Sequence, residues 1–300
     1  MSILQHSALR AFLKRHSDDT ATERPLAVFD CDGTVIKGDI GEAMLYYQIE
    51  KFLFRTSPAL IWTDHPHREQ LDRLYNAIIA AKACDRTASP EFAPFATMIL
   101  DWYFGQIDNG KVEKACGDIV RLFAGYSLAE VRQIAEETFT REFNAPLTDR
   151  ALGGRVVPRG ARFIVESVDI IRRLLELGFE IWAVSGSNKW SVESVFQRLN
   201  IPPQQVIGIE LKTVDGILTP EVVEPVPIRE KKVESLQGHT AGVPILVASD
   251  SKNDIPLLLY SSDLKMRVNS RNRDTEDFFR TARSTPDESW INIETPTIAQ

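Results

Sequence analysis

Short, nearly continuous runs of apolar residues recur along the chain, and several of them end directly before a polar residue. Leu26–Phe29 precedes Asp30, and residues 180–184 precede Ser185. Runs of this kind predict strands that are buried on both faces of a parallel sheet. Three further runs cover Val206–Ile209, residues 244–248 and residues 265–268.

Helical patterns lie between these runs. Residues 168–177 have apolar positions at helical spacing, and Gly178 follows at the position of a helix stop. Alternating strands and helices predict an α/β fold with a doubly wound parallel sheet. Such sheets bind ligands at the carboxyl ends of their strands, where Asp30, Ser185 and Asp250 are expected to meet.

A different pattern fills residues 37–158, where no run is typical of a strand. Helical periodicity recurs over residues 41–55, 68–83, 94–107, 112–124 and 128–143. Glycine and proline residues at 153–160 are suitable for a hinge or linker. We therefore predict an all-helical domain, residues 37–158, inserted into an α/β core of residues 1–36 and 159–300. The polar tail after Asn269 is expected to be a partly ordered surface segment.

Composition narrows the class of protein. The net charge of −7 argues against general nucleic-acid binding, which needs a basic surface. The three cysteines form no CxxC pair, so neither a zinc site nor a disulfide framework is expected. No apolar stretch approaches the roughly 18 residues of a membrane span, and none resembles a signal peptide. These features predict a cytoplasmic protein without nucleic-acid or membrane partners, and they leave its oligomeric state open.

The first candidate motif is the sequence Asp30-Cys31-Asp32-Gly33-Thr34 after the first strand. Asp30 can attack phosphorus and form an acyl phosphate, while Asp32 protonates the leaving oxygen and later deprotonates water. Gly33 permits the backbone conformation that brings both carboxylates forward. A solvated acidic turn is the alternative. The sequence argues against an EF-hand, because the twelfth residue from Asp30 is Gly41 rather than an acidic one.

A second acidic pair, Asp250 and Asp254, follows the strand expected at residues 244–248. Side chains four residues apart at a helix start can face the same point. Mg²⁺ binds few carboxylates together with waters and phosphate oxygens, so Asp30 and Asp250 are expected to bind it directly and Asp254 directly or through water. The alternative is a helix cap at Asp250 with Asp254 at the surface.

Two weaker signals complete the set. Ser185 and Gly186 can donate hydrogen bonds to a phosphoryl group, and Lys231 or Lys232 can neutralise its charge. Taken singly, an ordinary helix cap and a pair of solvated lysines explain these residues. The order of all four signals, at strand or helix ends on one edge, favours a common site.

In this order, the four motifs resemble the signature of the haloacid dehalogenase (HAD) superfamily. A helical insert between the first and second motifs is similar to the phosphoserine and phosphocholine phosphatase branch. The resemblance implies a HAD-like core and a Mg²⁺ cofactor. It also implies the following roles: Asp30 as nucleophile, Asp32 as acid/base that binds metal through its backbone carbonyl, Ser185 in phosphoryl binding, and Asp250 with Asp254 as metal ligands.

The same resemblance separates the two lysines. Val-Glu-x-Leu often follows the motif lysine, which favours Lys232 over Lys231. Asn253 lies where the family has an asparagine near the phosphate, and Thr34 and Gly186 belong to the expected phosphate-binding set. Dehalogenases proper lack the second aspartate of the first motif, so Asp32 favours phosphoester chemistry.

Substrate choice is expected to depend on the insert. Asp39 stands nine residues after Asp30, where phosphoserine phosphatases have an acidic residue that contacts the substrate amine. Glu42 could serve instead, and a solvated helix charge is the alternative for both. Eight aromatic residues of the insert could form a cation–π cage for choline or simply a core. They are Tyr46, Tyr47, Phe52, Phe54, Trp62, Trp102, Tyr103 and Phe104.

The expected function is hydrolysis of a small phosphorylated metabolite, such as phosphoserine or phosphocholine. Two alternatives stay open on the residues alone. One is a phosphotransferase with the same aspartyl-phosphate intermediate, and the other is a catalytically silent phospho-accepting or binding module.

Overall fold

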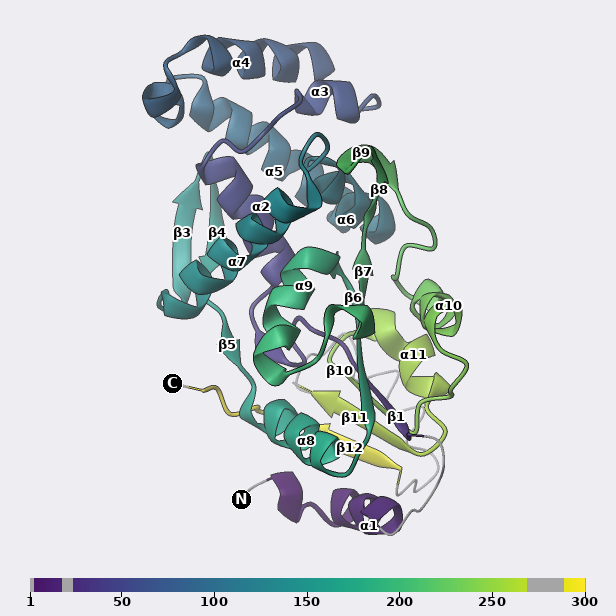
Figure 1. The fold of residues 1–300 in the computed structure, drawn as a ribbon. Coiled ribbons are helices and arrows are strands. Elements are labelled where there is room, and N and C mark those ends of the chain that lie inside the picture. Colours follow the sequence, from purple (N-terminus) through teal and green to yellow (C-terminus); the bar gives the residue numbers. More distant parts are fainter. Residues whose placement is uncertain (1–2, 18–23, 269–288, 300) are drawn as a thin grey trace.

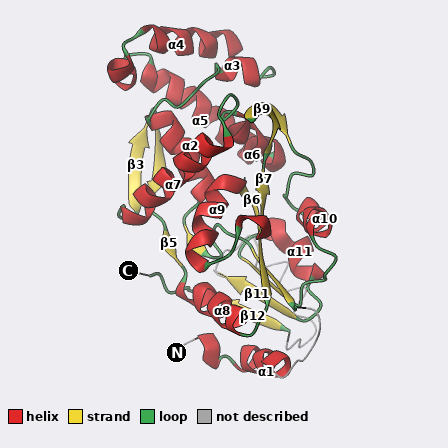
Figure 2. Ribbon diagram, viewed as in Figure 1, coloured by secondary structure: helices red, strands yellow, loops and turns green. Residues whose placement is uncertain are grey.

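The computed structural model describes residues 3–17, 24–268 and 289–299. Its centre is a parallel sheet (Figures 1 and 2). The strand order is β12-β11-β10-β1-β6-β7. The strands span β1 (Leu26–Phe29), β6 (Glu180–Asn188), β7 (Val206–Ile209), β10 (Leu246–Ser249), β11 (Leu264–Val268) and β12 (Trp290–Ile293). Each of the apolar runs identified in the sequence forms one of these strands.

Alternation of side chains along β1 divides the core into two layers. Ala27 and Phe29 pack in a cluster with residues of α1 (Ser7–Ser17), α8 (Val165–Glu176) and α9 (Lys189–Phe196). Leu26 and Val28 pack on the opposite face, with residues of α10 (Glu230–His239) and α11 (Ile255–Tyr260). Helices therefore cover both faces of the sheet, and the predicted doubly wound α/β fold is confirmed.

The segment predicted to be helical contains six α-helices grouped at one end of the molecule (Figure 1). They span α2 (Ile40–Glu50), α3 (Pro58–Ile61), α4 (Arg68–Ala80), α5 (Phe92–Asp108), α6 (Val112–Arg121) and α7 (Leu128–Asn144). Their apolar faces share a core in which Trp62 and Phe95 are buried. α6 contacts β6 and β7, so this helix lies beside the carboxyl edge of the sheet.

The expectation of a purely helical insert is wrong at its end. β3 (Thr148–Leu152) and β4 (Arg155–Arg159) form an antiparallel hairpin. Gly153 and Gly154 connect the two strands, and Gly153 has φ of +58°. Two glycines suit the two-residue turns of hairpins, which need positive φ. The sequence pattern predicts a hinge here instead, because the flanking strands are mostly exposed and carry little apolar pattern.

A second hairpin, β8 (Leu211–Val214) and β9 (Ile217–Val222), follows β7 and was not predicted. It leaves the core and pairs with the insert. The backbone N–H of Gly125 donates to the carbonyl of Leu218 at 2.8 Å, and the N–H of Leu218 donates to that of Tyr126 at 2.8 Å. Leu218 is buried among the insert's apolar residues. The hairpin therefore joins the insert to the sheet.

The described end of the chain corrects the tail prediction. β12 lies beside β11 as an edge strand, although residues 269–288 of the predicted tail lie outside the described residues. A short two-stranded ladder, β2 (Ile36–Lys37) with β5 (Arg162–Phe163), connects the two ends of the insert. Short 3-10 helices cover Ile3–Gln5, Ala83–Ala88, Gln197–Leu199, Pro203–Gln205 and Lys252–Asp254. Within the described ranges, no helix combines the length and apolar character that crossing a bilayer requires.

Candidate active site

A cavity of about 250 Å³ lies at the carboxyl edge of the sheet, between the core and the insert. The residues predicted for the site line it, with the exception of Thr34, which is buried and contacts Asp30 and Asp250. The lining includes Asp30, Asp32, Asp39, Ser185, Gly186, Lys232, Asp250, Asn253 and Asp254. Sequence positions up to 224 residues apart therefore meet at one point.

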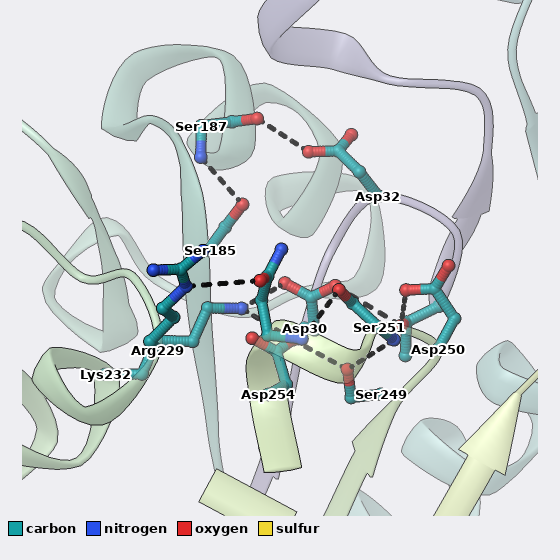
Figure 3. Close-up of polar contacts among 12 residues, drawn as sticks. Asp30, Asp32, Ser185, Ser187, Arg229, Lys232, Ser249, Asp250, Ser251 and Asp254 are labelled. Atoms are coloured by element: carbon teal, nitrogen blue, oxygen red, sulfur yellow. Dashed lines mark hydrogen bonds and ion pairs between the residues drawn. The ribbon is translucent and has the colours of Figure 1, made fainter. Parts of the chain in front are cut away.

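Lys232 lies at the base of the cavity between two carboxylates (Figure 3). Its Nζ is 2.8 Å from Oδ1 of Asp30 and 2.7 Å from Oδ2 of Asp254. Ser249 donates a further hydrogen bond to Oδ2 of Asp254 at 2.6 Å. The Lys232 side chain is only 5% exposed, so both carboxylates have a buried cationic partner.

The charge state of Lys232 follows from this environment. Burial alone would lower its pKa, but Asp254 and Asp30 raise it more strongly, and the pKa lies above the usual range for lysine. The side chain is therefore an ammonium group with three N–H donors. Two of these donors point to Asp30 and Asp254, which leaves the third for a substrate oxygen.

Lys231 points elsewhere, although it is adjacent in sequence. Its Nζ is 2.6 Å from Oε1 of Glu113 on α6, and it also contacts Glu224 at 3.4 Å. Its side chain is 37% exposed. Of the two candidate lysines, only Lys232 reaches Asp30.

Asp32 turns away from Lys232, toward the insert. The backbone N–H of Ile40, the first residue of α2, donates to its Oδ1 at 2.7 Å. The hydroxyl of Ser187 donates to its Oδ2 at 2.7 Å. Burial raises the pKa of Asp32 to about 6, against the opposing effect of these two hydrogen bonds. A carboxyl group with such a pKa can give up and regain a proton near neutral pH.

Asp250 approaches Asp30 from the end of β10. The hydroxyl of Thr34 lies between them, 3.3 Å from Oδ2 of Asp30 and 3.4 Å from Oδ1 of Asp250. Gly33 has φ of +75°, and a Cβ atom there would lie 2.1 Å from Oδ2 of Asp250. Glycine therefore allows this close approach. Burial and the neighbouring Asp254 raise the pKa of Asp250 to about 7.

The oxygen atoms around Asp30 and Asp250 fit Mg²⁺. These two carboxylates converge on Thr34, whereas the Asp254 carboxylate is already bound by Lys232 and Ser249. No group of three Asp, Glu, His or Cys side chains that could hold an ion by themselves occurs among the described residues. Mg²⁺ commonly binds one or two carboxylates and keeps several waters, so this sparse donor set suits it.

Ser185 and Gly186 form the wall opposite Asp250. The N–H of Ser187 donates to Oγ of Ser185 at 3.1 Å, so the Ser185 hydroxyl can donate its own hydrogen to a ligand. A Cβ atom at Gly186 would lie 3.2 Å from Ile228, so a larger residue would crowd this wall. Ser185 and Gly186 are thus placed to contact a phosphoryl group.

Polar contacts at the cavity also involve residues that the sequence analysis does not single out. Ser187 contacts Asp32, Ser249 contacts Asp254, and Nε of Arg229 lies 3.4 Å from Oδ1 of Asn253. Ser187 and Ser249 are adjacent to recognised motifs, but no spacing rule distinguishes them from helix caps. Arg229 has φ of +56°, which only the folded backbone reveals.

The insert contributes two carboxylates to the cavity. Asp39 caps α2 by accepting a hydrogen bond from the N–H of Glu42 at 2.7 Å. Glu42 accepts hydrogen bonds from Tyr46 at 2.7 Å and Tyr103 at 3.0 Å. Burial raises the pKa of Asp39 well above its usual range, and the nearby Asp32 and Glu42 add to this effect.

The aromatic residues of the insert belong mainly to its core. Tyr103 is the one aromatic side chain of the described residues that lines the cavity. The others are buried or partly buried in the apolar cluster of the insert. A cage of ring faces, which a choline group would require, is therefore not formed by the described residues.

Comparison with known proteins identifies the family. The family model of haloacid dehalogenase-like hydrolases matches residues 27–259. The chain belongs to this family. The match extends from β1, through the insert, to α11, and it confirms the superfamily resemblance predicted from the four motifs.

Relatives of this HAD hydrolase include phosphoserine phosphatase SerB2 of Mycobacterium tuberculosis, which is 37% identical over 93 residues. That match covers 29% of this chain and 22% of SerB2, so it spans about a fifth of the relative.

Two solved structures share the fold over nearly the whole chain. One is a conserved, functionally unknown protein from Anaerococcus prevotii DSM 20548, with a TM-score of 0.70 and 18% identity, covering 97% of this chain and 95% of that one. The other is a protein with unknown function from Bordetella pertussis Tohama I, with a TM-score of 0.55 and 20% identity, covering 91% and 99%.

Proposed function

We propose that this HAD hydrolase is a Mg²⁺-dependent phosphomonoester hydrolase that works through an aspartyl-phosphate on Asp30. The observation that carries the proposal is the pairing of two adjacent carboxylates with different partners. The ammonium group of Lys232 lies 2.8 Å from Oδ1 of Asp30. Asp32 instead accepts hydrogen bonds from two neutral donors, the backbone N–H of Ile40 and the hydroxyl of Ser187. Burial raises the pKa of Asp30, and the Lys232 ammonium opposes this effect by favouring the carboxylate that attacks phosphorus. Asp32, without such a partner, is suited to proton transfer.

The residues divide the reaction into two steps. Asp30 attacks phosphorus while Asp32 gives its proton to the leaving oxygen, and Asp32 then takes a proton from the water that hydrolyses the acyl phosphate. Lys232, Ser185 and Gly186 hold the phosphoryl oxygens. Asp30, Asp250 and the carbonyl of Asp32 would hold Mg²⁺, and Asp254 would act only through Lys232 or a water. The metal would supply charge neutralisation at the phosphoryl group.

We further propose that residues 37–158 act as a cap over a core of residues 1–36 and 159–300. The support comes from the contacts of the insert with the site. α2 donates the Ile40 N–H to Asp32, and α6 lines the cavity with Val112, Ile119 and Val120. An apolar wall above the phosphoryl position would exclude water until the acyl phosphate has formed.

The cavity favours a small substrate with an ammonium group that carries N–H donors. Its volume of about 250 Å³ suits a metabolite rather than a polymer. Asp39 and Glu42 contribute two carboxylates, and neither is paired with a lysine or arginine in the described part of the chain. Without an aromatic cage, this wall suits phosphoserine better than phosphocholine. The similarity to a phosphoserine phosphatase supports the same choice.

A cytoplasmic location belongs to the same proposal. Its support is the state of the cysteines, because Cys31, Cys84 and Cys116 are all free thiols. Disulfides are typical of oxidising compartments, and free thiols fit a reducing one.

Removal of divalent metal is the first test of the proposal. The protein should release phosphate from p-nitrophenyl phosphate with Mg²⁺, lose this activity in EDTA, and regain it when Mg²⁺ is restored. Asp250→Asn should weaken Mg²⁺ binding at least about tenfold, because one of two carboxylate ligands is lost. Calorimetric titration with Mg²⁺ measures this without turnover. Full activity in EDTA would contradict the metal assignment.

The ammonium preference is tested at Asp39. Asp39→Asn should lower the ratio of kcat/KM for phosphoserine to that for p-nitrophenyl phosphate by about tenfold or more, because a charge-assisted hydrogen bond is lost. Asparagine still caps a helix, so α2 should remain intact. Glu113→Gln is the matched control, because that carboxylate binds Lys231 instead of lining the cavity. An unchanged ratio in Asp39→Asn would remove Asp39 from substrate recognition.

A further inference from the structure

Ser187 occupies an unusual position at the end of β6. Its hydroxyl donates to Oδ2 of Asp32 at 2.7 Å, and its backbone N–H donates to Oγ of Ser185 at 3.1 Å (Figure 3). It also lines the cavity. One residue thus connects the wall that faces the phosphoryl group with the carboxyl group proposed to transfer protons.

The two oxygens of Asp32 have different neighbours. Oδ1 accepts the backbone N–H of Ile40 at 2.7 Å, and Oδ2 accepts the Ser187 hydroxyl. A backbone N–H can only donate, whereas a hydroxyl can donate to a carboxylate and accept from a carboxylic acid. Oδ2 is therefore the oxygen whose hydrogen-bond partner, the Ser187 hydroxyl, is compatible with both the ionised and the protonated form of Asp32.

The packing around Ser187 is tight. A Cβ atom at Gly41, in the first turn of α2, would lie 2.4 Å from Oγ and 2.7 Å from Cβ of Ser187. Contacts of this length do not occur, so α2 can approach Ser187 this closely only because residue 41 is glycine. The Ser187 hydroxyl thus has little freedom to move away from Asp32.

We propose that Ser187 is a positioning residue for Asp32: its hydroxyl holds Oδ2 and so fixes the orientation of the carboxyl group that serves the leaving oxygen. This inference rests on the proposed function, because it needs Asp32 as the acid/base. It adds a residue for which the four motifs imply no role.

The proton and bond changes balance over the two steps. In the first, the Asp30–phosphorus bond forms and the ester bond breaks, while the proton on Oδ2 leaves its hydrogen bond to the Ser187 hydroxyl and moves to the leaving oxygen. The Ser187 hydroxyl then turns to donate to the carboxylate. In the second, water attacks phosphorus, its proton moves to Oδ2, Asp30 is released, and the Ser187 hydroxyl accepts from the restored acid.

A series of aryl phosphates tests this role through the basicity of the leaving group. p-Nitrophenolate leaves without a proton, whereas phenolate is far more basic and needs one. We expect Ser187→Ala to lose at least about tenfold more kcat/KM with phenyl phosphate than with p-nitrophenyl phosphate, as impaired general acid catalysis requires. For Ser187→Ala, a plot of log kcat/KM against leaving-group basicity should be steeper than the wild-type plot and should approach the slope for Asp32→Asn.

The matched control is Ser194→Ala in α9. Ser194 is buried and donates to the carbonyl of Ser191 at 2.6 Å, so the variant loses a buried hydroxyl away from Asp32. Its line should have the wild-type slope. A Ser187→Ala line parallel to wild type, whether lowered or not, would overturn the inference, because a purely structural defect lowers all substrates equally.

The inference and the proposed function fail in different measurements. Wild-type protein that releases no phosphate from any aryl phosphate with Mg²⁺ would overturn the proposed function and the role of Ser187 with it. Active wild-type protein with parallel lines would overturn the role of Ser187 alone.

Discussion

Replacing Asp30 by asparagine is expected to lower kcat with p-nitrophenyl phosphate by at least about 10⁴-fold. The amide is nearly the same size, but it cannot attack phosphorus to form an acyl phosphate, and loss of a nucleophile has effects of this order in other enzymes. Phosphoprotein trapped by acid quench from radiolabelled substrate should disappear together with turnover. Both readouts test the same side chain at two stages of the reaction.

The control for this variant is Asp263→Asn. Asp263 is partly exposed, binds Arg15 at 2.8 Å, and lies away from the cavity lining. The Asp263→Asn enzyme should hydrolyse p-nitrophenyl phosphate and form phosphoprotein as the wild-type enzyme does. An Asp30→Asn enzyme with a tenth of the wild-type rate, or with labelled phosphoprotein, would mean that another residue is the nucleophile.

The core and the strand-end residues could be predicted because the signals are local. Leu26–Phe29 is apolar at every position, and the structure buries every one of these residues. Asp30 must then follow the strand at the carboxyl edge of the sheet. The same argument placed Ser185 and Asp250, since each directly follows its strand or lies near its end.

Contacts between distant segments could not be predicted in the same way. The motifs single out Lys232 and Asp254 and leave open whether Asp254 binds a metal directly or through water, but they do not indicate that its carboxylate binds Lys232 and Ser249. Which partner the Asp254 carboxylate meets depends on how α10 and α11 are placed over the sheet, and no residue pattern specifies that placement. Ser187 shows the same limit, because its partner Asp32 is 155 residues away.

The hairpins show why short strands are harder to identify than buried ones. β3 and β4 are mostly exposed, so the apolar runs that identify the core strands are absent. For β8 and β9, Asp215 and Gly216 both have positive φ, and an Asp-Gly pair is a common hairpin turn. That signal was present in the sequence, but without long apolar flanks it was indistinguishable from a loop.

Replacing Lys232 by methionine should impair both catalysis and folding. Methionine keeps the approximate length of the side chain but leaves Asp30 and Asp254 buried without their cation. Breaking a buried ion pair in this way costs about 3–5 kcal/mol of unfolding free energy. Loss of a charged donor at the phosphoryl group should lower kcat at least about 100-fold. Urea denaturation and initial rates measure the two effects separately.

Lys231→Met is the matched control, with the same substitution one residue earlier. Lys231 is partly exposed and binds Glu113 and Glu224 at the surface, where an ion pair contributes less than about 1 kcal/mol. Its kcat and unfolding free energy should stay close to wild type. A Lys231→Met enzyme with the larger loss of kcat would reverse the assignment, because Lys231 would then have to reach Asp30 during turnover. Equal, small effects of both variants would show that no ammonium group is needed beside the nucleophile.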